Sequence, residues 1–317
     1  MAERVAQIAS HITYPKGLLA QQTAIITGSG QGIGAEAARL FAQEGAKVVV
    51  CDVDSGKLQL LSPWKDLRKH SFEMNKVDHA NTSCYRTKAN AQRVVEDIAR
   101  SGGQALAVPG DITDAEYIDQ LVKRAAEFGG GEIHIIVNNA GYTWDGVVHK
   151  MTDKQWAAME NIHGTAPFQL IRTAAPYFRV KDGKQRNIVG ISSTSGVHGN
   201  AGQSNYAFFK AGVSGLMKTI AKEWGPAFNV RANTVAFGYI ETRLTQAKEA
   251  GAFITGPGGE KVQLGVPGRD GKSSFEDIPL RRPGSAEDAA KVVLAVCSPL
   301  FSYVTGQVIS VTGGRNM

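Results

Sequence analysis

A glycine-rich turn near the start of the chain constrains the fold more than any other feature of the sequence. The apolar run 23–26 leads into residues 27–34 (TGSGQGIG), and a helix-forming stretch follows at 35–44. A strand, a glycine turn and a helix in this order form the first unit of a parallel α/β sheet, whose helix N-terminus can hold the phosphates of a dinucleotide. The glycine spacing alone is only moderately specific, because many glycine turns bind no ligand.

Strands and helices alternate along the rest of the chain. Apolar runs predict strands at 23–26, 47–51, 104–108, 133–137, 188–191, 230–235 and 306–311, and helical periodicity predicts helices at 35–44, 89–100, 152–177, 204–224 and 286–297. Capping boxes at 113–116 and 152–155 predict two helix starts. This order is typical of an α/β fold with a single doubly wound parallel sheet of the Rossmann type and helices on both faces. We therefore predict a lead-in at residues 1–20 and one α/β domain at 21–317.

Two stretches interrupt this order. Residues 55–87 mix charges and turn formers without a clean period, so we interpret them as an insertion after the second strand. Residues 243–283 are rich in glycine and include prolines, and loops of this length in compact domains commonly cover a site. We interpret the second stretch as a lid over a substrate.

The composition limits the classes of protein to which the chain can belong. Of its 317 residues 43% are hydrophobic, enough for a sizeable core, and no apolar run is long enough to span a membrane. The cysteines (Cys51, Cys84 and Cys297) lie far apart, so neither a disulfide framework nor a metal site is indicated. The net charge of +6 is scattered, and no groove-reading motif for nucleic acid is present. Because no signal-peptide pattern opens the sequence, we expect a cytoplasmic protein.

Three polar residues in the second half form a candidate proton-transfer site. Tyr206 and Lys210 are four residues apart in a predicted helix, so the phenol and the ammonium project from one face. A nearby cation favours the phenolate and lowers the phenol pKa from about 10, toward the range in which a general acid or base works. Ser193 follows the apolar run 188–191, where its hydroxyl can bind a substrate oxygen. A Tyr-x-x-x-Lys pattern alone is common on helix surfaces, so the interpretation depends on its context.

An acidic residue ends the second predicted strand. Asp52 lies about twenty residues after the glycine turn, where a carboxylate can accept hydrogen bonds from both ribose hydroxyls of NAD. The same charge would repel the 2′-phosphate of NADP, and residues 27–34 contain no Arg or Lys to receive it. The sequence therefore favours NAD(H). Two alternatives stay open: Asp52 only caps a turn, or NADP(H) is used and the insertion supplies a cation such as Lys57.

Together these segments resemble the short-chain dehydrogenase/reductase family, from about residue 19 to residue 314. The resemblance implies a catalytic serine, tyrosine and lysine at Ser193, Tyr206 and Lys210, with Tyr206 and Lys210 also contacting the cofactor. It implies further cofactor contacts from the glycine turn, the acidic residue, the pair at adenine, the Asn-Asn-Ala-Gly signature and the segment at the nicotinamide. These residues are Gly28, Gln31, Gly32, Ile33, Gly34, Asp52, Asp111, Ile112, Asn139, Gly141, Gly238, Ile240 and Thr242.

Two positions depart from the family pattern. The family usually has an asparagine seven residues after the position of Trp156, whose backbone holds a water in the proton relay, and here that position is His163. The imidazole can join the relay, touch the substrate or simply pack in the core, so His163 is a fourth candidate catalytic residue. Asn161 can take the relay position only if the helix bulges. Phe237 stands where the family mostly has proline, and it can alter the loop into the lid or line the nicotinamide pocket.

The resemblance implies an oxidoreductase that transfers hydride between NAD(H) and a secondary alcohol or ketone. The stretches 162–168 and 304–308 look most like 3-oxoacyl reductases and hydroxysteroid dehydrogenases, so we expect an apolar acyl, aryl or steroid-like substrate. An NADP(H)-dependent reductase of 3-oxoacyl groups on acyl carrier protein or CoA is the alternative. A non-catalytic NAD-binding regulator is more remote, because the tyrosine and the lysine are both retained.

The resemblance also implies which partners the protein binds. Family members commonly form homotetramers or homodimers by packing the helices that correspond to 152–177 and 204–224. We expect a homo-oligomer that binds a small-molecule carbonyl or alcohol, and neither nucleic acid nor a membrane.

Overall fold

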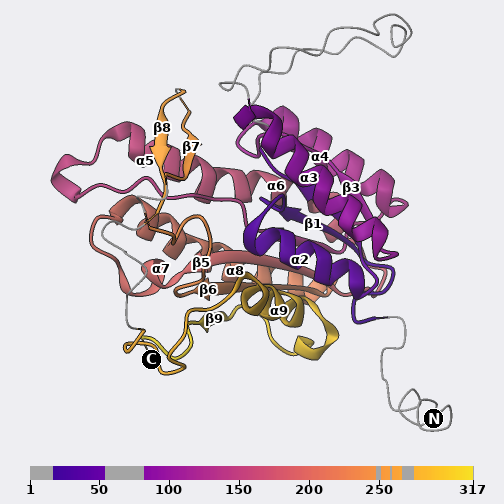
Figure 1. The fold of residues 1–317 in the computed structure, drawn as a ribbon. Helices are drawn as coiled ribbons and strands as arrows, with labels where there is room; N and C mark the ends of the chain where they lie inside the picture. Colours follow the sequence, from indigo (N-terminus) through magenta and orange to yellow (C-terminus); the bar gives the residue numbers. More distant parts are fainter. Residues whose placement is uncertain (1–16, 54–81, 248–250, 258, 266–274, 317) are drawn as a thin grey trace, which may run out of the picture.

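One parallel sheet forms the centre of the protein. The structure, a computed structural model, describes residues 17–53, 82–247, 251–257, 259–265 and 275–316 (Figure 1). In these ranges seven strands pair in the order β3-β2-β1-β4-β5-β6-β9, all of them parallel. Their bounds are β1 Thr23–Thr27, β2 Lys47–Cys51, β3 Gln104–Ala107, β4 Ile135–Asn138, β5 Arg186–Ser193, β6 Val230–Phe237 and β9 Val308–Val311. The sheet confirms the predicted doubly wound α/β fold.

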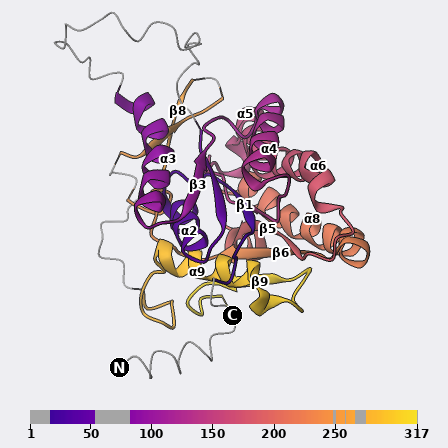
Figure 2. The same ribbon diagram turned by 90° about the vertical axis from the view of Figure 1, so that its right-hand side faces the viewer.

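Helices cover both faces of this sheet (Figure 2). On one face lie α2 (Gly32–Gln43), α3 (Thr82–Arg100) and α9 (Ala286–Cys297), and on the other α4 (Ala115–Gly129), α6 (Ala166–Phe178) and α8 (Ser204–Phe228). None of the described helices has both the length and the apolarity needed to span a membrane.

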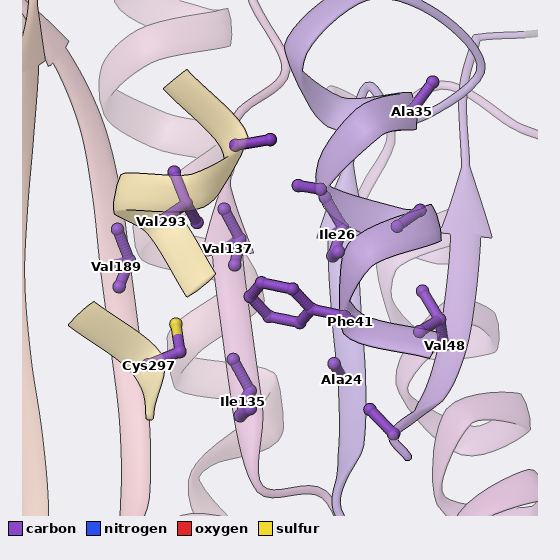
Figure 3. Packing of buried hydrophobic residues seen from close by; sticks show 14 of the residues in the cluster. Ala24, Ile26, Ala35, Phe41, Val48, Ile135, Val137, Val189, Val293 and Cys297 are labelled. Atoms are coloured by element: carbon purple, nitrogen blue, oxygen red, sulfur yellow. The ribbon is translucent and has the colours of Figure 1, made fainter. Parts of the chain in front are cut away.

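Side-chain alternation along the strands divides the core into two layers. Ala24 and Ile26 of β1 pack with α2 and α9, whereas Ile25 between them packs with α4, α6 and α8. Figure 3 shows the ring of Phe41, from α2, pointing across β4 toward Cys297 of α9. Because both faces of the central strands β1, β2, β4, β5 and β6 are buried, these strands read as continuous apolar runs, and this is why they could be predicted.

Two local predictions differ from the structure. Helix α3 begins at Thr82, so the last six residues of the predicted insertion 55–87 are helical, and residues 55–81 lie outside the described ranges. The capping box at 113–116 was wrong. The hydroxyl of Thr113 donates to Asp111 (2.8 Å), and Asp114 caps α4 instead by accepting from the N–H of Glu116. The box at 152–155 is confirmed.

Candidate active site

The residues predicted to be functional gather at one edge of the sheet. Since β1, β2, β4, β5 and β6 are parallel, their carboxyl ends meet there. The glycine turn follows β1, Asp52 follows β2, residues 139–141 follow β4, Ser193 ends β5, and Gly238 follows β6. The strand order reverses between β1 and β4, which is where open α/β sheets bind ligands.

The glycine turn has a conformation that disfavours other residues. The backbone φ is +63° at Gly28 and +56° at Gly32. A Cβ on Gly34 would lie 2.3 Å from the carbonyl oxygen of Gly28, so only glycine lets the turn close. Asn139 fastens the turn to β4, because its Nδ2 donates to the carbonyl oxygens of Thr27 (2.9 Å) and Gly28 (3.1 Å). The structure thus shows Asn139 supporting the turn, and its contact with a cofactor stays a prediction.

The first turn of α2 fits a phosphate group. Gln31 precedes the helix in an extended conformation. The structure describes every residue of the first turn of α2, and none of them is acidic. Nothing lies within 4 Å of where a Cβ on Gly32 would be, so a ligand can approach the backbone closely there. Backbone N–H groups without helical partners and the positive end of the helix dipole favour an anion at this position. The residues present therefore suit the diphosphate of a dinucleotide.

Asp52 ties β2 to the glycine turn. Its Oδ2 accepts from the N–H of Gly30 (2.8 Å), and its Oδ1 accepts from the N–H of Val53 (2.8 Å). Burial raises the pKa of Asp52 by more than these two N–H groups and the positive charge of Arg243 lower it, so the pKa is raised. Arg243 is a charged residue of this site that no sequence motif indicated. Its place directly after the predicted cofactor residue Thr242 was the only signal that could have pointed to it.

Ser193 joins β5 to the short helix α7 (Thr194–His198). Its Oγ accepts from the N–H of Ser195 (3.1 Å) and caps α7, which leaves the hydroxyl hydrogen to be donated. Helix α7 packs so closely on α8 that a Cβ on Gly196 would lie 2.6 Å from the carbonyl carbon of Lys210. This packing brings the serine within hydrogen-bonding reach of Tyr206.

Lys210 and Tyr206 project from the same face of α8. The Lys210 side chain is buried, its Nζ donates to the carbonyl oxygen of Ile191 (2.8 Å), and Nζ lies 5.6 Å from the centroid of the Tyr206 ring. The hydroxyl of Ser192 donates to the carbonyl oxygen of Lys210 (2.6 Å), which anchors α8 to β5. The structure therefore brings Ser193, Tyr206 and Lys210 into one cluster.

The charge states of this cluster differ from the expectation that Lys210 lowers the pKa of Tyr206. The pKa of Tyr206 is raised to about 12: burial raises it most, the hydrogen bond with Ser193 lowers it, and the charge of Asp145 raises it. Burial also lowers the pKa of Lys210 to about 7. The expectation was wrong for this structure, because exclusion of water disfavours both charged forms and leaves Lys210 only partly charged at neutral pH.

A π-helical turn, Asn161–Thr165, separates α5 (Asp153–Glu160) from α6. The helix thus bulges, which was the condition for Asn161 to act in the relay. However, the carbonyl oxygen of Asn161 already accepts from the N–H of Ala166. His163 is the residue that faces the tyrosine: its ring centroid lies 5.1 Å from that of Tyr206, and the ring planes meet at 85°.

His163 is buried and neutral. Its Nε2 lies 2.8 Å from the carbonyl oxygen of Tyr142, and since a carbonyl only accepts, Nε2 carries the hydrogen. Burial and the charge of Lys210 lower the pKa of His163 well below its ordinary value. The side chains of His163 and Lys210 line a cavity of about 10 Å³. Its other walls, from β4, β5, α6 and α8, are mostly apolar. The imidazole therefore borders the phenol and this cavity, and its part in a relay stays a prediction.

The remaining predicted cofactor residues lie around the same edge. Asp111 is exposed, Ile112 and Thr242 are half-buried, Ile240 is buried, Gly141 lies against the ring of His163, and Gly238 donates to the carbonyl oxygen of Val311. Phe237 was expected to alter the loop into the lid or to line the nicotinamide pocket, and the structure places it in the core. Its side chain is buried in the core layer of α2 and α9, because strand alternation turns it to the same face as Val235.

The predicted lid at 243–283 contains a hairpin in its described residues. Strands β7 (Phe253–Thr255) and β8 (Lys261–Gln263) pair antiparallel (Figure 1). Glu260 accepts from the Nζ of Lys154 on α5 (2.8 Å), and that Nζ lies 5.9 Å from the centroid of the Trp144 ring. The hairpin is thus tied to the loop beside the site, and a role in covering substrate stays a prediction. Residues 248–250, 258 and 266–274 of this segment lie outside the described ranges.

Comparison with known families and sequences agrees with this geometry. The family described as short chain dehydrogenase matches residues 22–83, and the related family described as enoyl-(acyl carrier protein) reductase matches residues 74–316. The chain is 33% identical over 292 residues to the 3-oxoacyl-[acyl-carrier-protein] reductase FabG of Thermotoga maritima, covering 92% of this chain and 96% of that protein. It is 32% identical over 300 residues to a 3-oxoacyl-[acyl-carrier-protein] reductase of Synechocystis, covering 94% and 98%.

Solved structures show the same arrangement. A dehydrogenase/reductase from Sinorhizobium meliloti superimposes with a TM-score of 0.69 at 27% identity, over 94% of this chain and 96% of its own. A short-chain dehydrogenase/reductase from Brucella melitensis shares the fold with a TM-score of 0.70 at 23% identity, over 95% and 99%. From the glycine turn, the serine–tyrosine–lysine cluster and these similarities, we conclude that the chain belongs to the short-chain dehydrogenase/reductase family of oxidoreductases.

Proposed function

We propose that this oxidoreductase uses NAD(H) to interconvert an apolar secondary alcohol and its ketone. The observation that carries the proposal is the cluster of Ser193, Tyr206 and Lys210 beside the glycine turn. When bound, the nicotinamide supplies or accepts the hydride. The Ser193 hydroxyl, whose oxygen already accepts from Ser195, donates to the substrate oxygen. The Tyr206 hydroxyl gives a proton to that oxygen in reduction, and in oxidation the Tyr206 phenolate takes a proton from it.

The preference for NAD(H) rests on Asp52. Its carboxylate is held by the N–H groups of Gly30 and Val53 at the end of β2, where the family resemblance places the adenosine ribose. A fixed negative charge there disfavours a 2′-phosphate and suits ribose hydroxyls.

The alternative is an NADP(H)-dependent 3-oxoacyl reductase. Two observations favour it. The similar proteins of Thermotoga maritima and Synechocystis are named 3-oxoacyl-[acyl-carrier-protein] reductases, and Arg243 places a positive charge near Asp52. An arginine can pair with a 2′-phosphate and offset the repulsion by the carboxylate.

Fluorescence titration with NADH and NADPH separates the two cofactors. We expect NADH to bind at least tenfold more tightly, and Asp52→Ser to reverse or erase this preference, with the surface variant Asp119→Asn as the matched control. Absorbance loss of the reduced cofactor with a panel of ketones and 3-oxoacyl thioesters then identifies the substrate class. Tighter NADPH binding with turnover only of thioesters would establish the alternative, and cofactor binding without any turnover would point to a regulator.

We also propose a relay role for His163. Because Nε2 is engaged by Tyr142, Nδ1 is the free acceptor of a neutral ring. His163→Asn, which restores the residue usual in the family, should keep turnover within about tenfold, whereas His163→Leu should lower it by at least that factor. Equal activities of the two variants would leave His163 a packing residue.

We further propose that the protein forms a homo-oligomer through α5, α6 and α8. These helices present aromatic side chains to solvent: Phe208 is 61% and Phe168 47% exposed, and the rings of Trp156 and Phe208 lie 5.2 Å apart. Contiguous exposed aromatic surface marks association sites. Light scattering after size exclusion should give a dimer or tetramer for the protein, and a smaller species for Phe208→Glu.

A further inference from the structure

Polar side chains join the first turn of α8 to the loop at residues 142–147, which follows β4. We propose that Gln203 and Asn205 are positioning residues that hold Asp145 near the phenol of Tyr206, so that the Asp145 charge shifts the pH range of proton transfer upward. This inference rests on the proposed function, since it concerns the proton that Tyr206 moves.

Asn205 is the buried centre of this junction. Its side chain is 0% exposed, and its Nδ2 donates to the carbonyl oxygens of Trp144 and Gln155 (3.1 Å each). Its Oδ1 accepts from the backbone N–H of Tyr206 (2.7 Å). One amide thus links the loop, α5 and the backbone of the proton-transferring residue. Removing it would take this partner from three part-buried backbone groups, so the amide helps to fix where Tyr206 stands relative to the loop.

Gln203 holds the carboxylate. Its Nε2 donates to both oxygens of Asp145 (3.2 and 3.1 Å), and its Oε1 accepts from the hydroxyl of Ser195 (2.9 Å) and the Nδ2 of Asn200 (2.9 Å). The N–H of Gly146 donates to the carbonyl oxygen of Gly202 (2.8 Å), which aligns the two backbones beside it. Through Gln203 the carboxylate is therefore tied both to the start of α8 and to α7.

The groups that face Tyr206 come from four elements. Lys210 lies on the same helix, Ser193 ends β5, His163 comes from the π turn, and Tyr142 and Asp145 come from the loop. His163 and Ser193 are neutral, and Lys210 is only partly charged. Burial raises the pKa of Tyr206 most, the hydrogen bond with Ser193 lowers it, and the negative charge of Asp145 adds to the rise.

The charge has a predictable effect on catalysis. In alcohol oxidation the phenolate is the proton acceptor, so a higher pKa of Tyr206 moves the onset of activity to higher pH. Removing the Asp145 charge should move it down. Because Asp145 is exposed, dissolved salt should weaken the effect.

Two isosteric variants test the inference in opposite directions. Asp145→Asn removes the charge, and we expect the rising limb of the pH profile for alcohol oxidation to shift down by about half a pH unit or more, less so in high salt. Gln203→Glu removes the donor and adds a negative charge, and the limb should shift up. Asp119→Asn on α4 and Gln307→Glu before β9 make the same chemical changes far from Tyr206 and should shift nothing. Unchanged profiles in both site variants, or shifts as large in the controls, overturn the proposal.

A second measurement needs no substrate. The phenolate absorbance of each protein minus that of its Tyr206→Phe counterpart reports ionisation of Tyr206 alone, and Asp145→Asn should move it to lower pH. If no alcohol is oxidised but this titration shifts, the proposed function fails while the positioning role stands. If the titration does not move, the positioning role fails.

Asn205→Asp tests the geometric part. It keeps an acceptor for the N–H of Tyr206 but loses the donors to Trp144 and Gln155. We expect kcat to fall at least tenfold while the dissociation constant for NADH changes less than threefold. A wild-type kcat in a folded Asn205→Asp protein would exclude Asn205 as a positioning residue.

Discussion

The two ends of the parallel sheet bury ionisable side chains in opposite ways. At the carboxyl end, burial raises the pKa of Tyr206 to about 12 and lowers that of Lys210 to about 7, so both shift toward their neutral forms. At the amino end, the 1% exposed Arg186 donates to both carboxylate oxygens of Asp182 (2.8 Å each), and this pairing lowers the pKa of Asp182. At the amino end a buried positive charge is paired with a carboxylate. At the carboxyl end burial favours the uncharged forms of the tyrosine and the lysine.

This difference separates stability from chemistry. The bidentate pair with Asp182 stabilises the charged form of the buried Arg186 and keeps strand β5 in place. A half-buried phenol and a buried amine without such compensation destabilise the fold, yet they can change protonation state during a reaction. We therefore expect variants at the amino end to change stability and variants at the carboxyl end to change activity.

The largest effect is expected at the carboxyl end. Tyr206→Phe should lower turnover by about 10²–10⁴-fold, because proton transfer to the substrate oxygen is lost. Its unfolding free energy and its affinity for NADH should stay close to those of the wild type, measured by denaturant unfolding and by fluorescence. Turnover retained in this variant would contradict the assigned role.

At the amino end the largest loss should be in stability. Asp182→Ala leaves the Arg186 guanidinium buried without its carboxylate and should lower the unfolding free energy by about 3 kcal/mol. The specific activity of the folded fraction should not change. A variant as stable as the wild type would show that the pair is compensated elsewhere.

A pH series on Lys210→Met tests the cost of the suppressed charge. Burial lowers the pKa of Lys210 in the folded state, so between about pH 7 and pH 10 the unfolded chain binds more protons and stability rises with pH. The inactive methionine variant should therefore be the more stable protein at pH 6, by at least about 1 kcal/mol, and this advantage should disappear as the pH approaches 10. An advantage that does not depend on pH would argue against a neutralised lysine.

The smallest effect is expected for Lys184→Met. Lys184 pairs with Glu132 at the amino end, but its side chain is 50% exposed. Exposed pairs contribute less than about 1 kcal/mol, so unfolding in denaturant should barely change. A loss as large as that of Asp182→Ala would mean that exposure does not distinguish the two pairs.

Much of the fold could be predicted because it depends on local patterns. Strands buried on both faces read as apolar runs, and the helix after the glycine turn starts within three residues of its predicted position. The capping box at 152–155 could be recognised from four residues. The serine, tyrosine and lysine could be proposed because Tyr206 and Lys210 share a helix face and Ser193 ends a strand.

Two of the errors concern contacts between distant segments, and the third is local. Phe237 was expected to alter the loop into the lid or to line the nicotinamide pocket, and only the packing of α9 shows that it lies in the core. The pKa of Tyr206 was expected to fall, and burial by α7, the π turn and the 142–147 loop raises it. The capping box at 113–116 failed because Asp111 competes for the Thr113 hydroxyl.

Sequence patterns were thus enough to establish the α/β architecture, the glycine turn and three members of the candidate site, because each of these depends on residues a few positions apart. The choice of His163 over Asn161 beside the phenol, the link from Gln203 to Asp145 and the burial of Arg186 emerge only when the chain is folded. Solvent exclusion and long-range hydrogen bonds set them, and both depend on which remote segments come to lie together.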